Sequence, residues 1–163
     1  MRSDTTMLIH ISQDRSWIHV VSIPRDSMVY RPACNLPGGG QSQAYDIGQF
    51  NGSFDAGGTL TGEGEDDLRY GAACTITTVM ENTGIPMPNH IVVKMDGVLD
   101  IVDAIGGVRI CLPQPVLGDS RYSDLDLPAG EQVLGGKVSL EYLRARHLVG
   151  LGDGSDTQRI DRQ

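Results

Sequence analysis

Lysine is nearly absent from this chain of 163 residues, because only Lys94 and Lys137 are lysines among 13 basic residues. The other basic residues are arginines, whose planar guanidinium donates two parallel hydrogen bonds to a phosphate or a carboxylate. A chain that used basic residues for solubility alone would contain more lysine. The composition therefore indicates arginines that recognise oxyanions.

Other features that the chain lacks exclude whole classes of protein. It has no excess of positive charge, since its formal net charge is −8, and this disfavours nucleic acid as a partner. No apolar run approaches the roughly 18 residues of a membrane-spanning helix. No pair of cysteines has the CxxC spacing of a zinc site. Aromatic residues make up only 5% of the chain, so the expected core is aliphatic.

The three cysteines leave two interpretations open. Cys111 lies in the apolar run 108–112, where we expect a small buried side chain rather than a nucleophile. Cys34 and Cys74 lie at the edges of a glycine-rich segment. A disulfide between them would suit an oxidising compartment and would stabilise the fold by roughly 3–4 kcal/mol. The alternative is three free, buried thiols.

The apolar periodicity predicts alternating strands and helices in a single domain, residues 1–163. This order indicates an α/β protein with a mixed β-sheet sandwiched between helices. A Gly- and acid-rich excursion, with its acidic run as solvated surface, is expected over 32–68. The expected elements are a hairpin (7–11 and 17–23), a helix (70–83), a strand (89–95), a helix capped by Asp96, a strand (108–112), a loop (114–134) and a helix (135–146).

Charged residues bracket the expected hairpin. Arg2 and Asp4 precede its first strand, and Arg25 and Asp26 follow its second strand. Because the start and the end of an antiparallel hairpin lie at the same edge, we expect these four side chains to converge. Such pairs are usually surface ion pairs of little energetic value. Two pairs at one strand end, after Pro24, are less easily dismissed as surface ion pairs.

Four arginines fall within the last twenty residues. Arg144 and Arg146 end the last expected helix, and Arg159 and Arg162 follow a glycine-rich bend. The spacing places Asp156, Arg159 and Gln163 on one helical face. The alternative is a polar terminal helix whose charges are merely solvated.

Six short blocks in this order resemble the LytR-CpsA-Psr proteins, which are membrane-anchored phosphotransferases of bacterial cell envelopes. The blocks cover the chain from end to end, and the details of some are similar to actinobacterial members. They are residues 2–8, residues 22–27, Phe50-Asn51 with Gly57-Gly58, residues 103–108, residues 127–130, and residues 144–147 with Asp156, Arg159, Arg162 and Gln163.

The resemblance implies an α-β-α fold and the transfer of a glycopolymer from a polyprenyl-pyrophosphate carrier to peptidoglycan. It also implies a position at the extracytoplasmic face of the cell membrane, with an N-terminal anchor and other family elements outside this chain. Arginine donors suit this chemistry, because they stabilise the charge that develops as a pyrophosphate bond breaks. A hydrolase of polyprenyl pyrophosphate, or a non-catalytic or regulatory protein that binds polyprenyl phosphate, is the alternative.

By the same resemblance, residue roles can be assigned. Asp4 would bind Mg²⁺, which prefers hard oxygen ligands. Asp26 and Asp156 would orient arginines, or one of them would be the base. Gln49 stands where many members carry lysine. The expected pyrophosphate ligands are Arg25, Arg144, Arg146, Arg159 and Gln163, supported by Arg2, Asn51 and Arg162.

Overall fold

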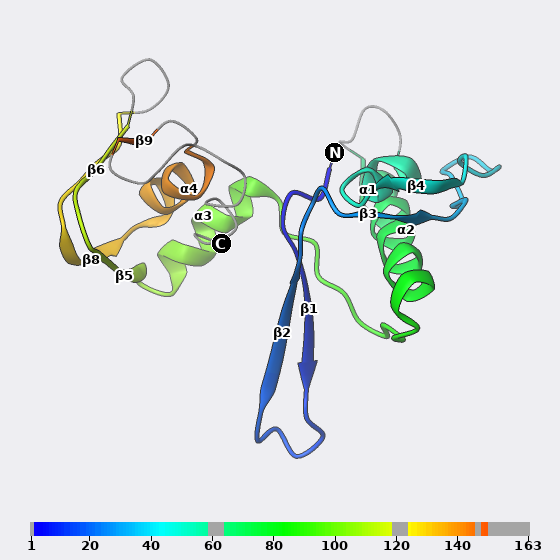
Figure 1. Ribbon diagram of the computed structural model, residues 1–163, viewed down its shortest axis with the longest axis horizontal. Helices are drawn as coiled ribbons and strands as arrows, with labels where there is room; N and C mark the ends of the chain where they lie inside the picture. The colour runs from blue at the N-terminus through cyan, green and yellow to red at the C-terminus, as the bar shows by residue number, and fades with distance from the viewer. Residues whose placement is uncertain (1, 59–63, 119–123, 146–147, 150–163) are drawn as a thin grey trace. The chain divides into compact units, whose positions relative to one another are not determined.

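The computed structural model describes residues 2–58, 64–118, 124–145 and 148–149. The chain forms two compact units, Met1–Val92 and Val93–Gln163, although the sequence predicts a single domain. Each unit has its own strands and helices, labelled in Figure 1. The prediction of an α/β protein is confirmed. The described strands pair antiparallel, in separate sheets of two or three strands.

The first unit begins with the predicted hairpin, formed by β1 (Thr6–Ile11) and β2 (Ile18–Ile23). Hydrogen bonds from the hydroxyls of Ser12 and Ser16 lower the pKa of Asp14, in the connecting turn, to about 2. One face of the hairpin carries Trp17 packed against His10 and His19, with ring centroids 5.0 and 4.6 Å from the indole. The opposite face is apolar and exposed, and its residues are Met7, Ile9, Ile11, Ile18 and Val20.

The rest of the first unit packs two helices on a short strand pair. Strand β3 (Met28–Arg31) pairs with β4 (Tyr45–Gln49), and helices α1 (Gly52–Gly57) and α2 (Glu65–Thr83) follow. The core contains Phe50, Phe54, Ala72 and Val79. Helix α1 packs closely against α2. A Cβ added at Gly71 of α2 would lie 2.5 Å from the ring of Phe54 on α1, so the glycine makes this approach possible.

The Gly- and acid-rich excursion expected over 32–68 is not a loop throughout, since it contains β4, α1 and the start of α2. Its acidic run is not simply solvated surface. The buried side chain of Asp67 accepts a hydrogen bond of 3.2 Å from the backbone N–H of Gly64, and so caps α2. Glu65 and Asp66 occupy the same first turn, where the helix dipole favours negative charge.

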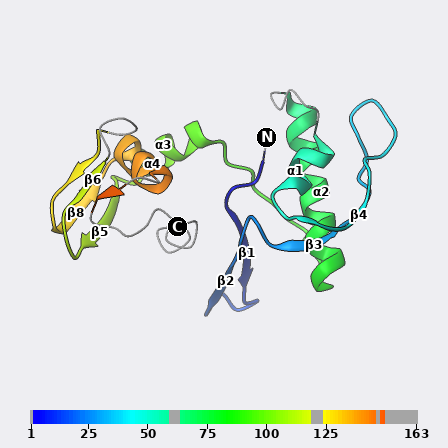
Figure 2. The same cartoon turned by 45° about the horizontal axis from the view of Figure 1, so that its top comes forward.

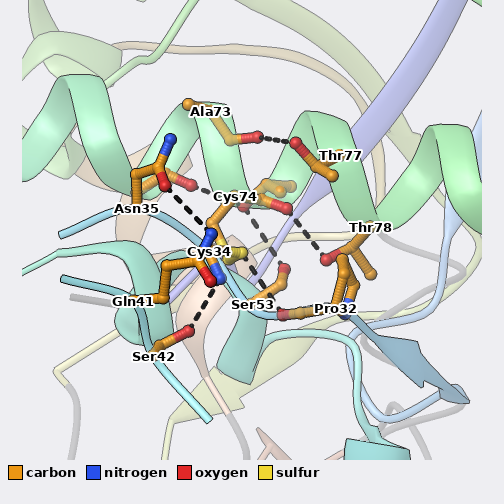
Figure 3. The surroundings of a disulfide bond; sticks show 12 residues. Pro32, Cys34, Asn35, Gln41, Ser42, Ser53, Ala73, Cys74, Thr77 and Thr78 are labelled. Atoms are coloured by element: carbon orange, nitrogen blue, oxygen red, sulfur yellow. Dashed lines mark hydrogen bonds between the residues drawn. A yellow bond between two sulfur atoms is a disulfide. The ribbon is translucent and has the colours of Figure 1, made fainter. Parts of the chain in front are cut away.

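The Cys34–Cys74 disulfide ties the loop after β3 to the middle of α2 (Figure 3). Both cysteines are buried, and the backbone N–H of Cys34 donates to the hydroxyl of Ser42 at 3.1 Å. The disulfide therefore holds both ends of this loop, residues 34 and 42, on α2. The interpretation with three free thiols is wrong, and Cys111 is the free cysteine.

The predicted strand over 89–95 is absent. Residues 84–94 have no helix or strand assignment, and Ile91 is 90% exposed. No described strand pairs with this segment, and an apolar run alone does not make a strand without a neighbour that accepts its backbone hydrogen bonds. The segment follows Gly84, which ends α2 in the left-handed conformation with φ 71°.

The second unit is built around aliphatic side chains. Helices α3 (Met95–Ala104) and α4 (Gly136–Arg144) lie side by side in both ribbon views (Figures 1 and 2). Strand β5 (Val108–Leu112) pairs with β8 (Gly130–Leu134), and β6 (Val116–Gly118) lies between β7 (Asp126–Leu127) and β9 (Leu148–Val149). The core cluster comprises Leu112, Val116, Leu125, Leu127 and Leu134.

Three predictions for this unit need correction. The described part of 114–134 is not a loop, because it contains β6, β7 and β8. Helix α3 has Lys94 at its N-cap, so Asp96 falls in the first turn instead. Cys111 is exposed rather than buried. Strand alternation explains this, since Leu112 points into the core and its neighbour Cys111 points to the other face.

None of the helices in the described ranges combines the length and the hydrophobicity that are needed to cross a bilayer.

Candidate functional site

The end of the hairpin gathers an arginine between two carboxylates. Arg25 follows β2 and Pro24, and its Nη1 lies 3.0 Å from Oδ1 of Asp4, which precedes β1. Its Nε lies 3.1 Å from Oδ2 of Asp26. The hairpin register explains the convergence, because Thr6 pairs with Ile23 and so brings the residues outside both strands to one edge. We call Asp4, Arg25 and Asp26 the Arg25 cluster.

Gln49, the last residue of β4, and the expected site residue Asn51, two positions later, also bond to this cluster. Gln49 donates a hydrogen bond of 3.2 Å from Nε2 to Oδ1 of Asp26. The backbone N–H of Asn51 donates to the carbonyl of Arg25 at 2.9 Å. Both oxygens of Asp26 are therefore engaged, one by Arg25 and one by Gln49. This arrangement holds the guanidinium of Arg25 in one orientation.

Asn51 is buried, with only 2% of its surface exposed. Its Oδ1 has no hydrogen-bond partner within the described part of the chain, and its side chain does not cap α1. An unsatisfied buried polar atom is costly, and such atoms concentrate at functional sites. Asn51 therefore belongs among the candidate site residues on structural grounds as well as by the resemblance.

Sequence reasoning missed Arg31, the last residue of β3. Its guanidinium carbon lies 4.3 Å from the centroid of the Tyr45 ring, and its buried Nε has no partner in the described ranges. A Cβ added at Gly52, next to Asn51, would come within 2.5 Å of Nη1 of Arg31. Arg31 and Val29 share the more buried face of the strand, and the two-residue period of a strand is the only sequence signal that places Arg31 with Val29.

Taken by itself, the Arg25 cluster favours a bound cation over a bound anion. Two carboxylates and one guanidinium sum to a local charge of −1. The side chains are partly open to solvent, with 26% of Arg25, 36% of Asp4 and 41% of Asp26 exposed. A pyrophosphate would therefore meet a compensated arginine unless further positive charge were present.

The donor set fits Mg²⁺ that binds together with a phosphate. In the described residues no group of three or more His, Cys, Asp or Glu side chains could hold a metal ion. Mg²⁺ is usually bound through only one or two carboxylates, plus substrate phosphates and water. Asp4 offers such a carboxylate, because its ion pair with Arg25 is made through Oδ1. The expectation that Asp4 binds Mg²⁺ stays a prediction.

The remaining predicted site residues lie elsewhere. Arg2 is exposed and has no ion pair among the described residues, so its place in the site stays a prediction. Arg144 is in the second unit, where it is the exposed last residue of α4. Five predicted site residues lie outside the described residues: Arg146, Asp156, Arg159, Arg162 and Gln163.

The model of the LytR_cpsA_psr family matches residues 1–163 of the chain. The cell wall biosynthesis protein LcpA of Corynebacterium glutamicum is 34% identical over 99% of this chain and 30% of its own length. A polyisoprenyl-teichoic acid–peptidoglycan teichoic acid transferase, TagU of Oceanobacillus iheyensis, is 31% identical over 99% of this chain and 43% of its own length.

The crystal structure of TagV from B. subtilis superposes on the chain with a TM-score of 0.67 at 25% identity, covering 99% of this chain and 53% of that one. The chain thus spans between about a third and about half of the length of these relatives. Their shared fold supports the predicted fold class.

Proposed function

The chain belongs to the LytR_cpsA_psr family, and we propose on this basis that it is part of a glycopolymer–peptidoglycan phosphotransferase. The observation that carries the proposal is the Arg25 cluster, in which one guanidinium is held by Asp4 and Asp26 at the end of a hairpin. The substrate would be a glycopolymer on a polyprenyl-pyrophosphate carrier, and the acceptor a peptidoglycan hydroxyl. The protein would act at the extracytoplasmic face of the membrane, with an anchor outside this chain.

The proposed reaction is a substitution at the phosphorus that carries the glycopolymer. The acceptor oxygen forms a new P–O bond to this phosphorus, and the bond from the phosphorus to the bridging oxygen breaks. Polyprenyl phosphate leaves with that oxygen, and the acceptor hydroxyl gives up its proton. Negative charge therefore grows on the leaving phosphate, and preorganised guanidinium donors stabilise it without reorganising.

Within this proposal, Arg25 binds the pyrophosphate and Asp26 orients Arg25. Asp26 is a poor candidate for the base, because both of its oxygens already accept hydrogen bonds. Asp4 would hold Mg²⁺ beside the phosphates, and the ion would supply the positive charge that the cluster lacks. Arg144, Arg146, Arg159 and Gln163 would be further ligands of the pyrophosphate.

The test is transfer by the full-length protein with Arg25→Ala or Arg144→Ala. Each charge-assisted hydrogen bond contributes roughly 1.5–3 kcal/mol, so each variant should lose about 10- to 100-fold or more in rate. Arg109→Ala is the matched control. The side chain of Arg109, on β5, is 75% exposed, and its Nη1 lies 3.4 Å from Oε1 of Glu131 on β8. Its loss should therefore leave transfer unchanged. Removal of Mg²⁺ with a chelator should stop the reaction, and added Mg²⁺ should restore it.

The products separate this proposal from its alternatives. Polyprenyl phosphate and peptidoglycan-linked polymer should appear together and only with acceptor present. Release of phosphate without acceptor would identify a hydrolase. Lipid binding without turnover under any acceptor would identify a binding protein. Unchanged transfer by Arg25→Ala would exclude the proposed site.

A further inference from the structure

Helix α4 receives its N-terminal cap from another helix. The backbone N–H of Gly136, the first residue of α4, donates a hydrogen bond of 2.7 Å to Oδ1 of Asp103 in the last turn of α3. The residue at the N-cap of α4 itself is Gly135, which makes no side-chain cap bond. The first backbone N–H groups of a helix have no partner within it, so a carboxylate placed there stabilises the helix.

Glycines allow the two helices to meet at this point. A Cβ added at Gly136 would collide with the carbonyl oxygen of Leu99 on α3. A Cβ at Gly107, just after α3, would lie 2.6 Å from Cγ1 of Val133 and 2.9 Å from the carbonyl oxygen of Leu134. Gly107 also has a φ of 96°, a backbone conformation that residues other than glycine rarely adopt. The end of α3 therefore contacts the β8–α4 junction backbone to backbone.

These contacts between α3 and the β8–α4 junction fix the direction in which α4 leaves β8. Helix α4 runs from Gly136 to Arg144, about 13 Å at 1.5 Å per residue. A tilt of about 5° at its start would move Arg144 by about 1 Å. A misplacement of this size at a catalytic group can cost as much as 10²-fold in rate.

We propose that Asp103 is a positioning residue for Arg144, and this inference rests on the proposed function. Asp103 does not contact the substrate. It anchors the start of α4 to α3 and thereby sets where the guanidinium at the other end of the helix lies. The separation of 33 residues between Asp103 and Gly136 makes this a tertiary contact that local helix signals do not contain.

The test compares Asp103→Ala, Asp103→Asn and the matched control Asp100→Ala in the full-length protein. Asp100 is an exposed carboxylate on the same helix, so its loss changes the charge equally. Asp103→Ala should lower kcat by about ten-fold, with little change in KM. Asp103→Asn keeps an oxygen acceptor and should retain most of the activity. Amide hydrogen exchange over residues 136–139 should rise in Asp103→Ala alone.

A double variant distinguishes positioning from general destabilisation. If Asp103 acts through Arg144, then Asp103→Ala should add no further loss of rate to Arg144→Ala. Full additivity, or wild-type kcat in Asp103→Ala while Arg144→Ala is impaired, would overturn the inference. Unchanged transfer by Arg144→Ala would instead remove Arg144 from the proposed site. The two failures therefore give different results.

Discussion

Among the described residues, the first unit holds the disulfide and most of the buried polar side chains, whereas the second unit is built around an aliphatic cluster. In the first unit Asn51, Ser53, Asp67 and Thr78 are all buried, and Ser53 and Thr78 lie in the surroundings of the Cys34–Cys74 bond (Figure 3). In the second unit Val116 and four leucines form the core. The first unit therefore adds one covalent link and several buried polar groups to its apolar core, whereas the second depends mainly on apolar volume.

The same contrast appears in how each unit places its arginine. Arg25 is held by two carboxylates within hydrogen-bond reach. Arg144 ends a helix and has no ion pair among the described residues, so its position depends on how α4 is anchored. One guanidinium is held by direct contacts, and the other, by our proposal, is placed through the backbone of α4. Substitutions should consequently affect the two arginines by different routes.

Removal of the disulfide should give the largest effect on stability and should act on the first unit. Replacing both cysteines, Cys34→Ser with Cys74→Ser, opens a loop of 40 residues. The chain-entropy relation assigns such a loop about 4 kcal/mol of unfolding free energy. Urea unfolding measures the loss, and amide hydrogen exchange locates it. Equal loss of protection in both units would contradict the contrast between them.

Truncation of a core leucine should be the counterpart in the second unit. Leu134→Ala removes a buried side chain from the aliphatic cluster and should cost about 3 kcal/mol. Val133→Thr is the control, because Val133 is the exposed neighbour on the same strand and should change stability by less than about 0.5 kcal/mol. Hydrogen exchange should increase over residues 93–145 first. An increase confined to residues 1–92 would argue against independent cores.

Loss of a helix cap should have a smaller effect. Helix α2 is capped by its own Asp67, whereas α4 is capped from α3. Asp67→Ala should cost about 1 kcal/mol and should fray only the first turn of α2. Asp66→Ala, which removes an exposed carboxylate 3.9 Å from Arg69, should cost less. Thermal unfolding of both variants, with exchange at residues 65–68, checks the order. The reverse order would mean that Asp67 does not act as a cap.

The elements with strong local periodicity could be predicted from the sequence. The hairpin, the cores of α2, α3 and α4, and β5 lie where the apolar spacing places them. The errors concern segments whose state depends on a distant partner. Residues 89–95 carry a strand pattern but have no described neighbour strand. Strands β6, β7 and β8 form within 114–134 because β8 pairs with β5, β6 pairs with β7, and their apolar side chains join the core.

The site residues also divide into those that the sequence could predict and those that depend on distant contacts. The convergence of Asp4, Arg25 and Asp26 follows from the topology of an antiparallel hairpin, so it could be derived from sequence order alone. Asn51 came only from the family resemblance, because nothing local shows that it is buried. The contact of Asp103 with Gly136 could not be foreseen, since it joins two helices across 33 residues.

The apolar face of the β1–β2 hairpin also bears on how the protein behaves at high concentration. Ile9, Ile18 and Val20 are each more than half exposed on a two-stranded ribbon, and no further strand in the described ranges pairs with its edges. Such edges act as templates for strands of other molecules, and net negative charge opposes their approach. Salt screens that repulsion, so concentrated samples will stay monodisperse longest in dilute buffer.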